Sequence, residues 1–296
     1  MIRFPRHYVA LIALVASLAA APALAAEDAG GAGQFFDSDG VSIHYRTWGA
    51  GDPIVLVHGF TASIDTNWVA PGVVAALADD FKVIALDARG HGKSDKPHDP
   101  AVYGDRMGDD VVRLLDHLEI DKAHVVGYSM GGFITLDLLT RHPDRFLSAT
   151  LGGAGWMPPG EQAGVPGLAE SLESGKGIAP LLEALTPPGQ PKPAPEQMAM
   201  INQMVMASND PLALAAVIRS MGELQTLEVD VKSIAVPLLA VVGEIDPLRA
   251  GVEALDALLP ATEVVVLLGK DHMTAMSDPA LAQAVRDFVI KQCQCA

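Results

Sequence analysis

The sequence predicts an α/β fold in which a mostly parallel sheet is covered by helices on both faces. Three observations support this prediction. Short apolar runs rich in valine and isoleucine recur along the chain, and segments of helical length separate them. Runs that are apolar on both faces are typical of parallel strands buried between two layers of helices. One long stretch without such runs indicates a small helical insertion.

The first predicted strand covers residues 41–48, where polar and apolar residues alternate with period two. This alternation predicts a half-exposed strand. The strands that follow are predicted from compact apolar runs, which are too short for buried helices. These runs are residues 54–57, 83–86, 124–126, 147–151, 238–242 and 264–268.

Helices are expected between these strands, where apolar residues recur at helical spacing. The last expected helix follows Ser277, Asp278 and Pro279, which suit an N-cap and a first helical turn. The alternation of strand and helix favours a doubly wound arrangement. The expected helices are residues 109–118, 131–141, 252–259 and 279–291.

Residues 155–227 break this alternation, because no strand–helix pair can be recognised in them. A proline-rich stretch, 186–195, is followed by methionine-rich helical stretches. A long insertion between strands is more often functional than structureless. We interpret it as a small helical cap on a core formed by residues 34–154 and 228–291. The methionines of residues 197–206 suit an adaptable apolar pocket and, equally, the hydrophobic core of the cap.

Residues 1–25 are predicted to be a signal peptide. Arg3 and Arg6 precede an apolar run, 9–21, and the sequence PALA at 22–25 supplies the small residues that suit signal peptidase. The apolar run is too short to span a bilayer comfortably as a permanent anchor. We therefore expect export, to the periplasm or the medium, with no stable membrane insertion after cleavage. An uncleaved membrane tether is the alternative.

The charge balance and the cysteines exclude several kinds of partner and cofactor. The chain has 20 Lys and Arg against 36 Asp and Glu. Such an acidic protein repels nucleic acid and anionic membrane surfaces. The two cysteines, Cys293 and Cys295, have no further Cys/His set to complete a zinc site, so we expect no metal and no cofactor. A local disulfide, an intermolecular bridge and a frayed tail are the alternatives for this pair.

The stretch VVGYSMGGF, residues 125–133, places Ser129 among glycines, after an apolar run and before a helical segment. Its core fits G-x-S-x-G in the strand-turn-helix context that a nucleophilic serine needs. Glycines let the strand and the helix approach closely around an exposed, strained serine. Free N–H groups at the start of the helix favour developing negative charge there. The alternative is a structural serine in a glycine-rich turn.

A serine nucleophile needs a base, and the base needs an acid that orients it. Asp246 and His272 each lie just beyond the end of a predicted strand. Groups beyond the carboxyl ends of parallel strands converge on one crevice. The chain therefore predicts that Ser129, Asp246 and His272 meet at one edge of the sheet. Glu244 and Asp271 are rival acids, but Asp271 directly precedes the histidine and is expected to point away from it.

An acyl-transfer site also needs donors for an oxyanion, usually two backbone N–H groups. The run 54–57 ends in His58, Gly59 and Phe60, where a strand gives way to a glycine turn. The amides of Phe60 and Met130 are the predicted oxyanion donors. His58 is expected to support its loop through hydrogen bonds rather than to carry protons.

The sequence resembles the α/β-hydrolase superfamily. The resemblance spans nearly the whole of the predicted mature chain, and its motifs occur in the order that the family shows. In dehalogenases and epoxide hydrolases of this family an aspartate stands where this chain has Ser129, so those activities are set aside. The matching motifs are HGF (58–60), DARGHGKSD (87–95), GYSMGG (127–132), GEIDP (243–247) and GKDH (269–272).

The resemblance implies a Ser129–His272–Asp246 triad, an oxyanion hole at Phe60 and Met130, and a cap after the sixth strand. We expect a serine esterase for a small or medium, largely apolar, uncharged carboxylic ester. The same groups serve lactone hydrolysis, carbon–carbon bond hydrolysis, aminopeptidase activity and cofactor-free perhydrolysis, and these stay open. A non-catalytic binding protein on the same fold is the further alternative. Trp156, at the entry to the cap, and Tyr128, beside the serine, are the predicted substrate-binding residues.

Overall fold

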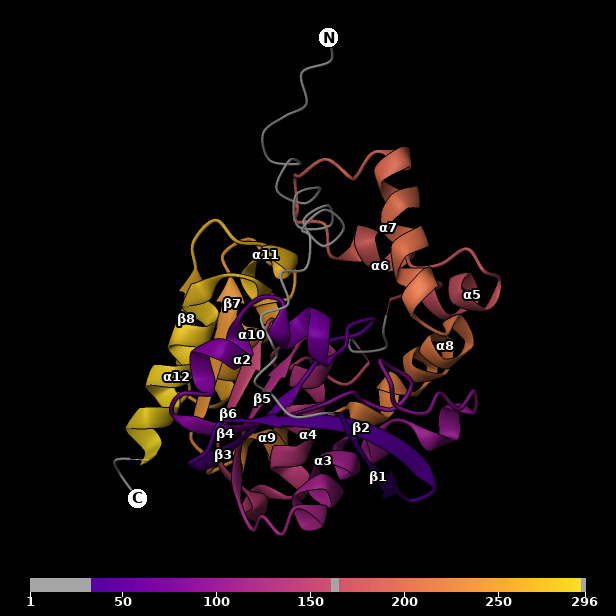
Figure 1. The fold of residues 1–296 in the computed structure, drawn as a ribbon. Helices are drawn as coiled ribbons and strands as arrows, with labels where there is room; N and C mark the ends of the chain where they lie inside the picture. Colours follow the sequence, from indigo (N-terminus) through magenta and orange to yellow (C-terminus); the bar gives the residue numbers. More distant parts are fainter. Residues whose placement is uncertain (1–32, 161–164, 294–296) are drawn as a thin grey trace.

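The computed structural model describes residues 33–160 and 165–293, so the predicted signal peptide lies outside the described residues. The strands are β1 (Gln34–Ser38), β2 (Val41–Trp48), β3 (Asp52–Val57), β4 (Phe81–Leu86), β5 (Ala123–Tyr128), β6 (Phe146–Gly152), β7 (Leu238–Gly243) and β8 (Glu263–Leu267). They form one sheet in the order β1-β2-β4-β3-β5-β6-β7-β8 (Figure 1). The pairs that β2 makes with β1 and β4 are antiparallel, and every other pair is parallel. The predicted mostly parallel sheet is confirmed.

Helices cover both faces of this sheet. One face packs against α3 (Asp105–His117), α4 (Met130–Arg141), α9 (Glu228–Lys232) and α10 (Arg249–Leu258). The other packs against the π-helical turn η1 (Asp65–Val69), α2 (Val73–Leu77), α11 (His272–Met276) and α12 (Pro279–Cys293).

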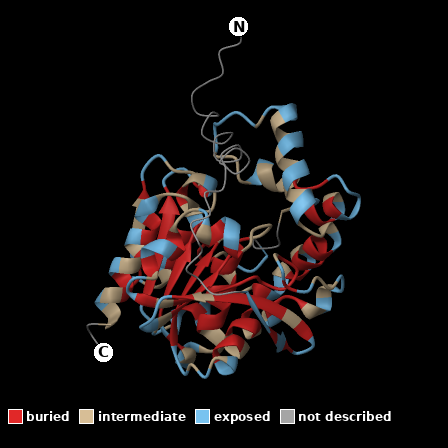
Figure 2. Ribbon diagram, viewed as in Figure 1, coloured by how far each residue is buried: buried red, intermediate tan, exposed pale blue. Residues whose placement is uncertain are grey.

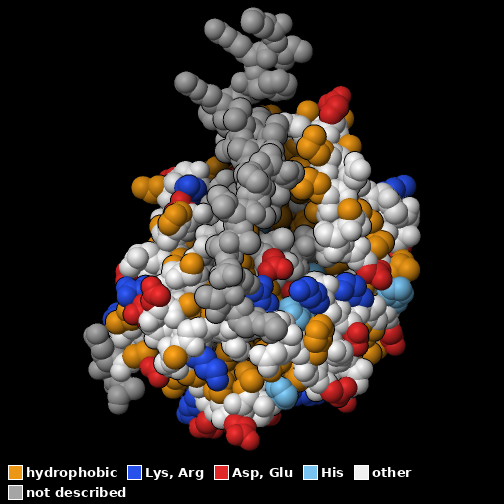
Figure 3. Space-filling view, viewed as in Figure 1, with side chains coloured by type: hydrophobic (Ala, Val, Ile, Leu, Met, Phe, Trp, Pro, Cys, Tyr) orange, Lys and Arg blue, Asp and Glu red, His pale blue; other side chains and the backbone are white. Residues whose placement is uncertain are grey.

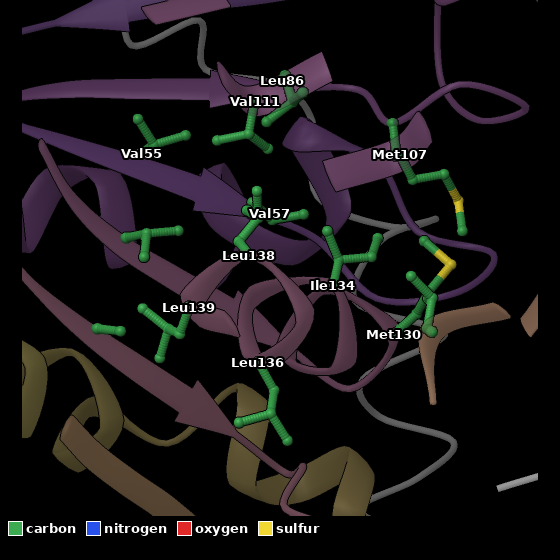
Figure 4. Packing of buried hydrophobic residues seen from close by; sticks show 14 of the residues in the cluster. Val55, Val57, Leu86, Met107, Val111, Met130, Ile134, Leu136, Leu138 and Leu139 are labelled. Atoms are coloured by element: carbon green, nitrogen blue, oxygen red, sulfur yellow. The ribbon is translucent and has the colours of Figure 1, made fainter. Parts of the chain in front are cut away.

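Neighbouring residues of one strand therefore enter different hydrophobic cores. Val55 and Val57 of β3 belong to the core on the side of α4, and Figure 4 shows Val57 beside Leu138. Leu56 lies between them in sequence and enters the core on the opposite face. Because both faces are buried, the central strands are red along their length in Figure 2 and appear in the sequence as uninterrupted apolar runs.

The N-terminal edge of the sheet differs from the prediction. Strand β2 is almost entirely buried rather than half exposed, because β1 pairs with its outer edge and its polar side chains have partners. The His44 ring, for example, lies 2.8 Å from a carboxylate oxygen of Asp87. The sequence reasoning did not find β1. A signal for it existed, since Asp39 and Gly40, both with positive φ, form the two-residue turn typical of a β-hairpin.

Four helices between β6 and β7 stand apart from the sheet, at the upper right of Figure 1. They are α5 (Leu168–Glu173), α6 (Ala179–Ala184), α7 (Pro195–Ser208) and α8 (Pro211–Ser220). All four fall within the predicted insertion, which we call the cap; its boundaries, 155 and 227, stay a prediction. Among the described helices, none combines the length and apolarity needed to cross a membrane.

The cap has a small hydrophobic cluster of its own, in which Leu168 and Leu172 of α5 pack with Leu214 of α8. Helix α7 borders this cluster but has no buried residue. Two of its methionines, Met200 and Met204, are exposed, and hydrophobic side chains gather over this helix in Figure 3. The α7 methionines are therefore not simply the core of the cap.

Candidate active site

Ser129 occupies the single position between the end of β5 and the start of α4. Its φ is 55° and its ψ is −117°, a backbone conformation that residues with a side chain rarely adopt. Such a conformation costs about 1–3 kcal/mol and persists only where the surroundings fix it. Here the Ser129 N–H donates to the Gly152 carbonyl at 2.8 Å, and the Ser129 carbonyl accepts from the Phe133 N–H at 3.1 Å. The predicted strained serine turn is thus present.

Two glycines let the chain close up around this turn. A Cβ atom at Gly131 would lie 2.0 Å from the carbonyl oxygen of Val57, so a side chain there would push α4 away from β3. A Cβ atom at Gly59 would lie 3.3 Å from the Cβ atom of Ser129. The turn after β3 and the serine turn therefore lie directly against each other.

The structure brings Ser129, His272 and Asp246 together. His272 Nε2 lies 3.0 Å from Ser129 Oγ, and His272 Nδ1 lies 2.9 Å from Asp246 Oδ2. The other oxygen of Asp246 accepts from the Leu248 N–H at 2.8 Å, which fixes the carboxylate. A carboxylate only accepts hydrogen bonds, so His272 carries its proton on Nδ1 and leaves Nε2 to accept from the serine hydroxyl. His272 and Asp246 are buried, whereas Ser129 is partly exposed.

The two rival acids lie elsewhere. One oxygen of Asp271 accepts from the N–H groups of Met273 and Thr274, at 3.1 and 2.8 Å, so this side chain caps α11 and points away from the histidine ring. Glu244 is exposed and accepts from the Gly269 N–H at 2.8 Å. Its contact joins the loops that follow β7 and β8. The acid that contacts His272 is therefore Asp246.

The two predicted substrate-binding residues lie in positions that support the site from behind. The Tyr128 hydroxyl donates to the backbone carbonyl of His272 at 2.5 Å, and its ring lies 5.4 Å from the His272 ring. Trp156 is buried, and its indole N–H donates to the Thr226 carbonyl at 2.9 Å, joining the two ends of the insertion. Tyr128 thus contacts His272 and Trp156 joins the two ends of the cap, while the binding of substrate by these two residues stays a prediction.

The amides of Phe60 and Met130, the predicted oxyanion donors, lie on the two turns that meet at Ser129. Among the described residues, neither N–H donates a hydrogen bond. The Met130 amide is free because it belongs to the first residue of α4. Its side chain enters the core and points toward Met107 in Figure 4. The Phe60 ring packs against both the core and the cap cluster.

The turn that carries the Phe60 amide is held by two buried side chains. The Gly59 N–H donates to Asn67 Oδ1 at 2.9 Å. His58 Nε2 accepts from the Ala88 N–H at 3.0 Å, which leaves Nδ1 to donate to the Gly59 carbonyl at 2.8 Å. His58 thus supports its loop, as expected from the sequence. Sequence reasoning missed Asn67, which lies in the π-helical turn η1; no motif marks this residue.

Asp87 ties this region to the neighbouring loops. It accepts from the N–H groups of Ile64 and Lys93, at 2.8 and 2.9 Å, and contacts the His44 ring. Burial raises the pKa of a carboxyl group, but the hydrogen bonds from His44 and the two amides outweigh burial here. They hold the pKa of Asp87 at about 2.

Two fully buried histidines, His58 and His91, lie beside Asp87, with their ring centroids 5.2 Å apart. Burial lowers the pKa of His58 below its usual value, although the charge of Asp87 opposes this effect. Burial and the neighbouring His58 lower the pKa of His91 to about 3. Both rings are therefore neutral in the folded protein at neutral pH, and His91 stays neutral at mildly acidic pH.

The protein is expected to lose stability progressively as the pH falls below about 6.5, the pKa of an unfolded histidine. Below that pH the unfolded chain binds protons at His58 and His91 that the folded protein does not, and for His91 this difference persists down to about pH 3. Each such proton removes about 1.4 kcal/mol of stability per pH unit. Asp87 extends the loss below about pH 4, where only the unfolded carboxyl group is protonated.

Thermal unfolding between about pH 7.5 and pH 4.5 measures this loss. The His91→Gln variant cannot bind the extra proton, so its free energy of unfolding should decline less steeply with falling pH. Equal slopes for the two proteins would contradict the assignment of His91.

Within residues 33–160 and 165–293, no group of His, Cys, Asp or Glu side chains has the arrangement of a metal site. Cys293 Sγ lies 3.6 Å from His124 Nε2, and burial together with nearby Asp52 raises the pKa of this thiol to about 11. The thiol is therefore protonated at neutral pH and a poor nucleophile. Cys295 lies outside the described residues.

The sequence model of a family described as "alpha/beta hydrolase fold" matches residues 52–179. The chain is also 35% identical over 160 residues to the dihydrolipoyllysine-residue acetyltransferase component of the acetoin cleaving system from Cupriavidus necator. That segment is 54% of this chain and 42% of the relative. The chain thus matches less than half the length of this curated relative.

Solved structures extend the likeness over most of the chain. A thermophilic esterase from Thermogutta terrifontis matches with a TM-score of 0.73 and 26% identity, over 88% of this chain and 99% of that one. An N-acyl homoserine lactone degrading enzyme matches with a TM-score of 0.66 and 28% identity, over 86% of this chain and 100% of that one. The similarity therefore reaches well beyond residues 52–179.

Proposed function

This chain belongs to the α/β-hydrolase superfamily, and from that premise we propose that it is a serine hydrolase that cleaves carboxylic esters through an acyl-enzyme. The observation that carries the proposal is the hydrogen-bonded series Ser129, His272, Asp246. The serine is the partly exposed member, and the other two are buried behind it. A substrate can therefore reach the nucleophile, while its base and its orienting acid stay shielded from water.

In the proposed reaction Ser129 Oγ attacks the ester carbonyl carbon while His272 Nε2 takes the hydroxyl proton. Asp246 holds the ring in the correct tautomer and stabilises the imidazolium that forms. The carbonyl electrons move onto oxygen, and the amides of Phe60 and Met130 stabilise that oxyanion. One such donor typically contributes about 10²–10³-fold to kcat.

The tetrahedral adduct then collapses. The bond to the alcohol oxygen breaks, and His272 gives its proton to the departing alkoxide, leaving an acyl group on Ser129. A water molecule next attacks the acyl carbon while His272 takes one of its protons. The second collapse breaks the bond to Ser129 Oγ, which regains its proton, and releases the carboxylic acid. One water is consumed, and the enzyme returns to its starting state.

We propose that the substrate is small to medium in size, largely apolar and uncharged. The negative net charge of −16 disfavours anionic substrates. The partly exposed Phe60 ring, on the turn that meets the serine turn, suits an apolar acyl group. The likeness to an esterase over almost its whole length supports an ester as the substrate class.

Ester, lactone and aminoacyl amide substrates, assayed side by side on the wild-type protein, test this proposal. We expect the highest kcat/KM for a short or medium p-nitrophenyl ester, and rapid labelling of Ser129 by a fluorophosphonate probe. A native protein that the probe does not label would contradict the serine hydrolase mechanism. Full activity on a large insoluble polyester, with none on short esters, would contradict the substrate class.

Lactone hydrolysis is the second candidate, favoured by the 28% identity to an N-acyl homoserine lactone degrading enzyme. The same attack by Ser129 Oγ on the carbonyl carbon opens a lactone, but the alcohol stays attached to the acyl group until water releases the product. A kcat/KM on lactones above that on open-chain esters of equal length would favour this candidate. Carbon–carbon bond hydrolysis, aminopeptidase activity, perhydrolysis and a non-catalytic binding role are not proposed.

We also propose that the protein is exported and that residues 1–25 are removed. The support is the sequence pattern of Arg3 and Arg6, the apolar run and the PALA end at residues 22–25. Expression of the full chain in a Gram-negative host should give a periplasmic or secreted protein whose N-terminal residue is Ala26. An intact N-terminus in a membrane fraction would instead indicate an uncleaved tether.

A further inference from the structure

The turn that carries the Phe60 amide is strained at its third residue. The Ala62 N–H donates to the Gly59 carbonyl at 3.2 Å, which closes a four-residue turn. Thr61 is the third residue of this turn and has a φ of 63°. That position normally takes glycine or asparagine, and a β-branched residue there is an outlier. A strained turn of this kind needs outside contacts to keep its shape.

The cap supplies such a contact. Asn209 directly follows α7, and its Nδ2 donates to the carbonyl oxygen of Thr61 at 3.2 Å. The same nitrogen lies 3.0 Å from the Val205 carbonyl, which anchors the amide to the last turn of α7. The preceding residue of the strained turn, Phe60, packs its ring against the cap cluster. The cap thus contacts two consecutive residues of this turn.

We propose that Asn209 is a positioning residue, through which the cap holds the Phe60 amide in its catalytic orientation. Asn209 does not belong to the triad, and its contact is with the Thr61 carbonyl. Without this contact the turn can relax from the left-handed conformation of Thr61, which rotates the neighbouring peptide groups. The Phe60 N–H would then no longer point steadily at the oxyanion. Docking of the cap and completion of the oxyanion hole would be one event.

This inference rests on the proposed serine hydrolase function. It differs from a general role of the cap in shielding the site, because it assigns the effect to one hydrogen bond on one turn. A neighbouring contact offers a matched control. His98 Nε2 lies 2.9 Å from Asp210 Oδ2, so it also links the cap to the core, but it does not touch the turn of residues 59–62.

The test is steady-state hydrolysis of a short p-nitrophenyl ester by the full chain. We expect Asn209→Ala to lower kcat by about tenfold and to leave KM nearly unchanged. This is only part of the loss in kcat that is expected when an oxyanion donor is removed outright. His98→Ala should stay within about twofold of wild type in both constants, as a surface substitution away from the site. A trifluoromethyl ketone, which forms a tetrahedral adduct with the serine, should bind Asn209→Ala more weakly by a factor that matches the loss in kcat/KM.

A second substitution, at Thr61, tests whether strain in the turn causes the loss of kcat. Glycine adopts the conformation of Thr61 without steric cost, so Thr61→Gly should largely restore kcat to the Asn209→Ala protein. Asn209→Asp, which keeps the side-chain shape but replaces the donor with an acceptor, should show the same loss and the same rescue. The melting temperature of each variant separates loss of orientation from loss of folding.

Three outcomes would overturn the inference while leaving the proposed function intact: an unchanged kcat in Asn209→Ala and Asn209→Asp, an equal loss in His98→Ala, or no rescue by Thr61→Gly. Failure of the proposed function has a different signature. In that case the wild-type protein itself would neither hydrolyse the esters nor react with the fluorophosphonate probe.

Discussion

Replacing Ser129 with alanine should lower kcat for ester hydrolysis by about 10⁴- to 10⁶-fold, the largest effect that any single substitution in this chain is expected to have. The hydroxyl of this residue is the group that forms the acyl-enzyme, and within the described part of the chain no other side chain hydrogen-bonds to His272 Nε2. The amides of Phe60 and Met130 and the substrate contacts survive the change, so a residual rate above that in water is expected.

A fold-preserving control accompanies this prediction. Ser129→Ala and Ser129→Gly both remove the hydroxyl, but only glycine adopts a φ of 55° without strain. The glycine variant should therefore be more stable than the alanine variant by about 1 kcal/mol, while both are inactive. Stopped-flow or endpoint assays at high enzyme concentration measure the residual rate, and thermal unfolding measures the stability.

The prediction is contradicted if Ser129→Ala keeps more than about one hundredth of the wild-type kcat. Labelling of that variant by a fluorophosphonate probe would have the same meaning. Either result would show that the hydrolytic nucleophile is another residue.

The structure explains why the strands other than β1, and the three central site residues, could be predicted. Each buried strand can be recognised in the sequence because a strand buried on both faces forms a short apolar run, as residues 238–242 do. Asp246 and His272 were found because each lies just beyond the end of such a run, and the carboxyl ends of neighbouring parallel strands meet at one edge.

Residues that hold the site in place but belong to no motif could not be predicted in the same way. Asn67 and Asn209 hold the turn of residues 59–62 from η1 and from the cap, and neither belongs to a motif or a periodic pattern. Tyr128 neighbours the serine in sequence, which favours a contact with substrate. In a strand, however, successive side chains point to opposite faces, and the Tyr128 side chain enters the core opposite α4. Such contacts depend on the packed fold.

The orientation of the cap helices could not be predicted from the sequence either. The presence of the cap was predictable because residues 155–227 lack strand–helix pairs. Few features of this stretch of sequence indicate how the helices of the cap are oriented. Helix α7 has no fully buried residue, and apolar residues lie both on the side that packs against the cap cluster and on the exposed side, so its sequence does not indicate which side faces the core. The helix contacts the cap cluster through Ile201, Val205 and Met206, and Asn209 at its end bonds to the turn that carries the oxyanion donor.

The identity of the orienting acid is the second large prediction. Asp246→Asn should lower kcat by about 10⁴-fold at neutral pH, although the side-chain shape and the fold are preserved. The carboxylate can only accept a hydrogen bond from His272 Nδ1, whereas an amide can also donate and thereby favours the tautomer whose Nε2 carries the proton. That tautomer cannot take the proton of Ser129, and an amide does not stabilise the imidazolium.

The matched control is Asp271→Asn, at the acid next to the histidine in sequence. Asp271 caps α11, and asparagine is an equally good N-cap, so kcat should stay within about threefold of wild type. Because both changes remove one carboxylate charge near the site, a difference between them isolates the hydrogen bond to Nδ1 from the general effect of charge. Kinetics of the two variants across about pH 6–9 decide between the acids. Equal losses in both variants would show that local charge, rather than the orientation of His272 by Asp246, supports the reaction.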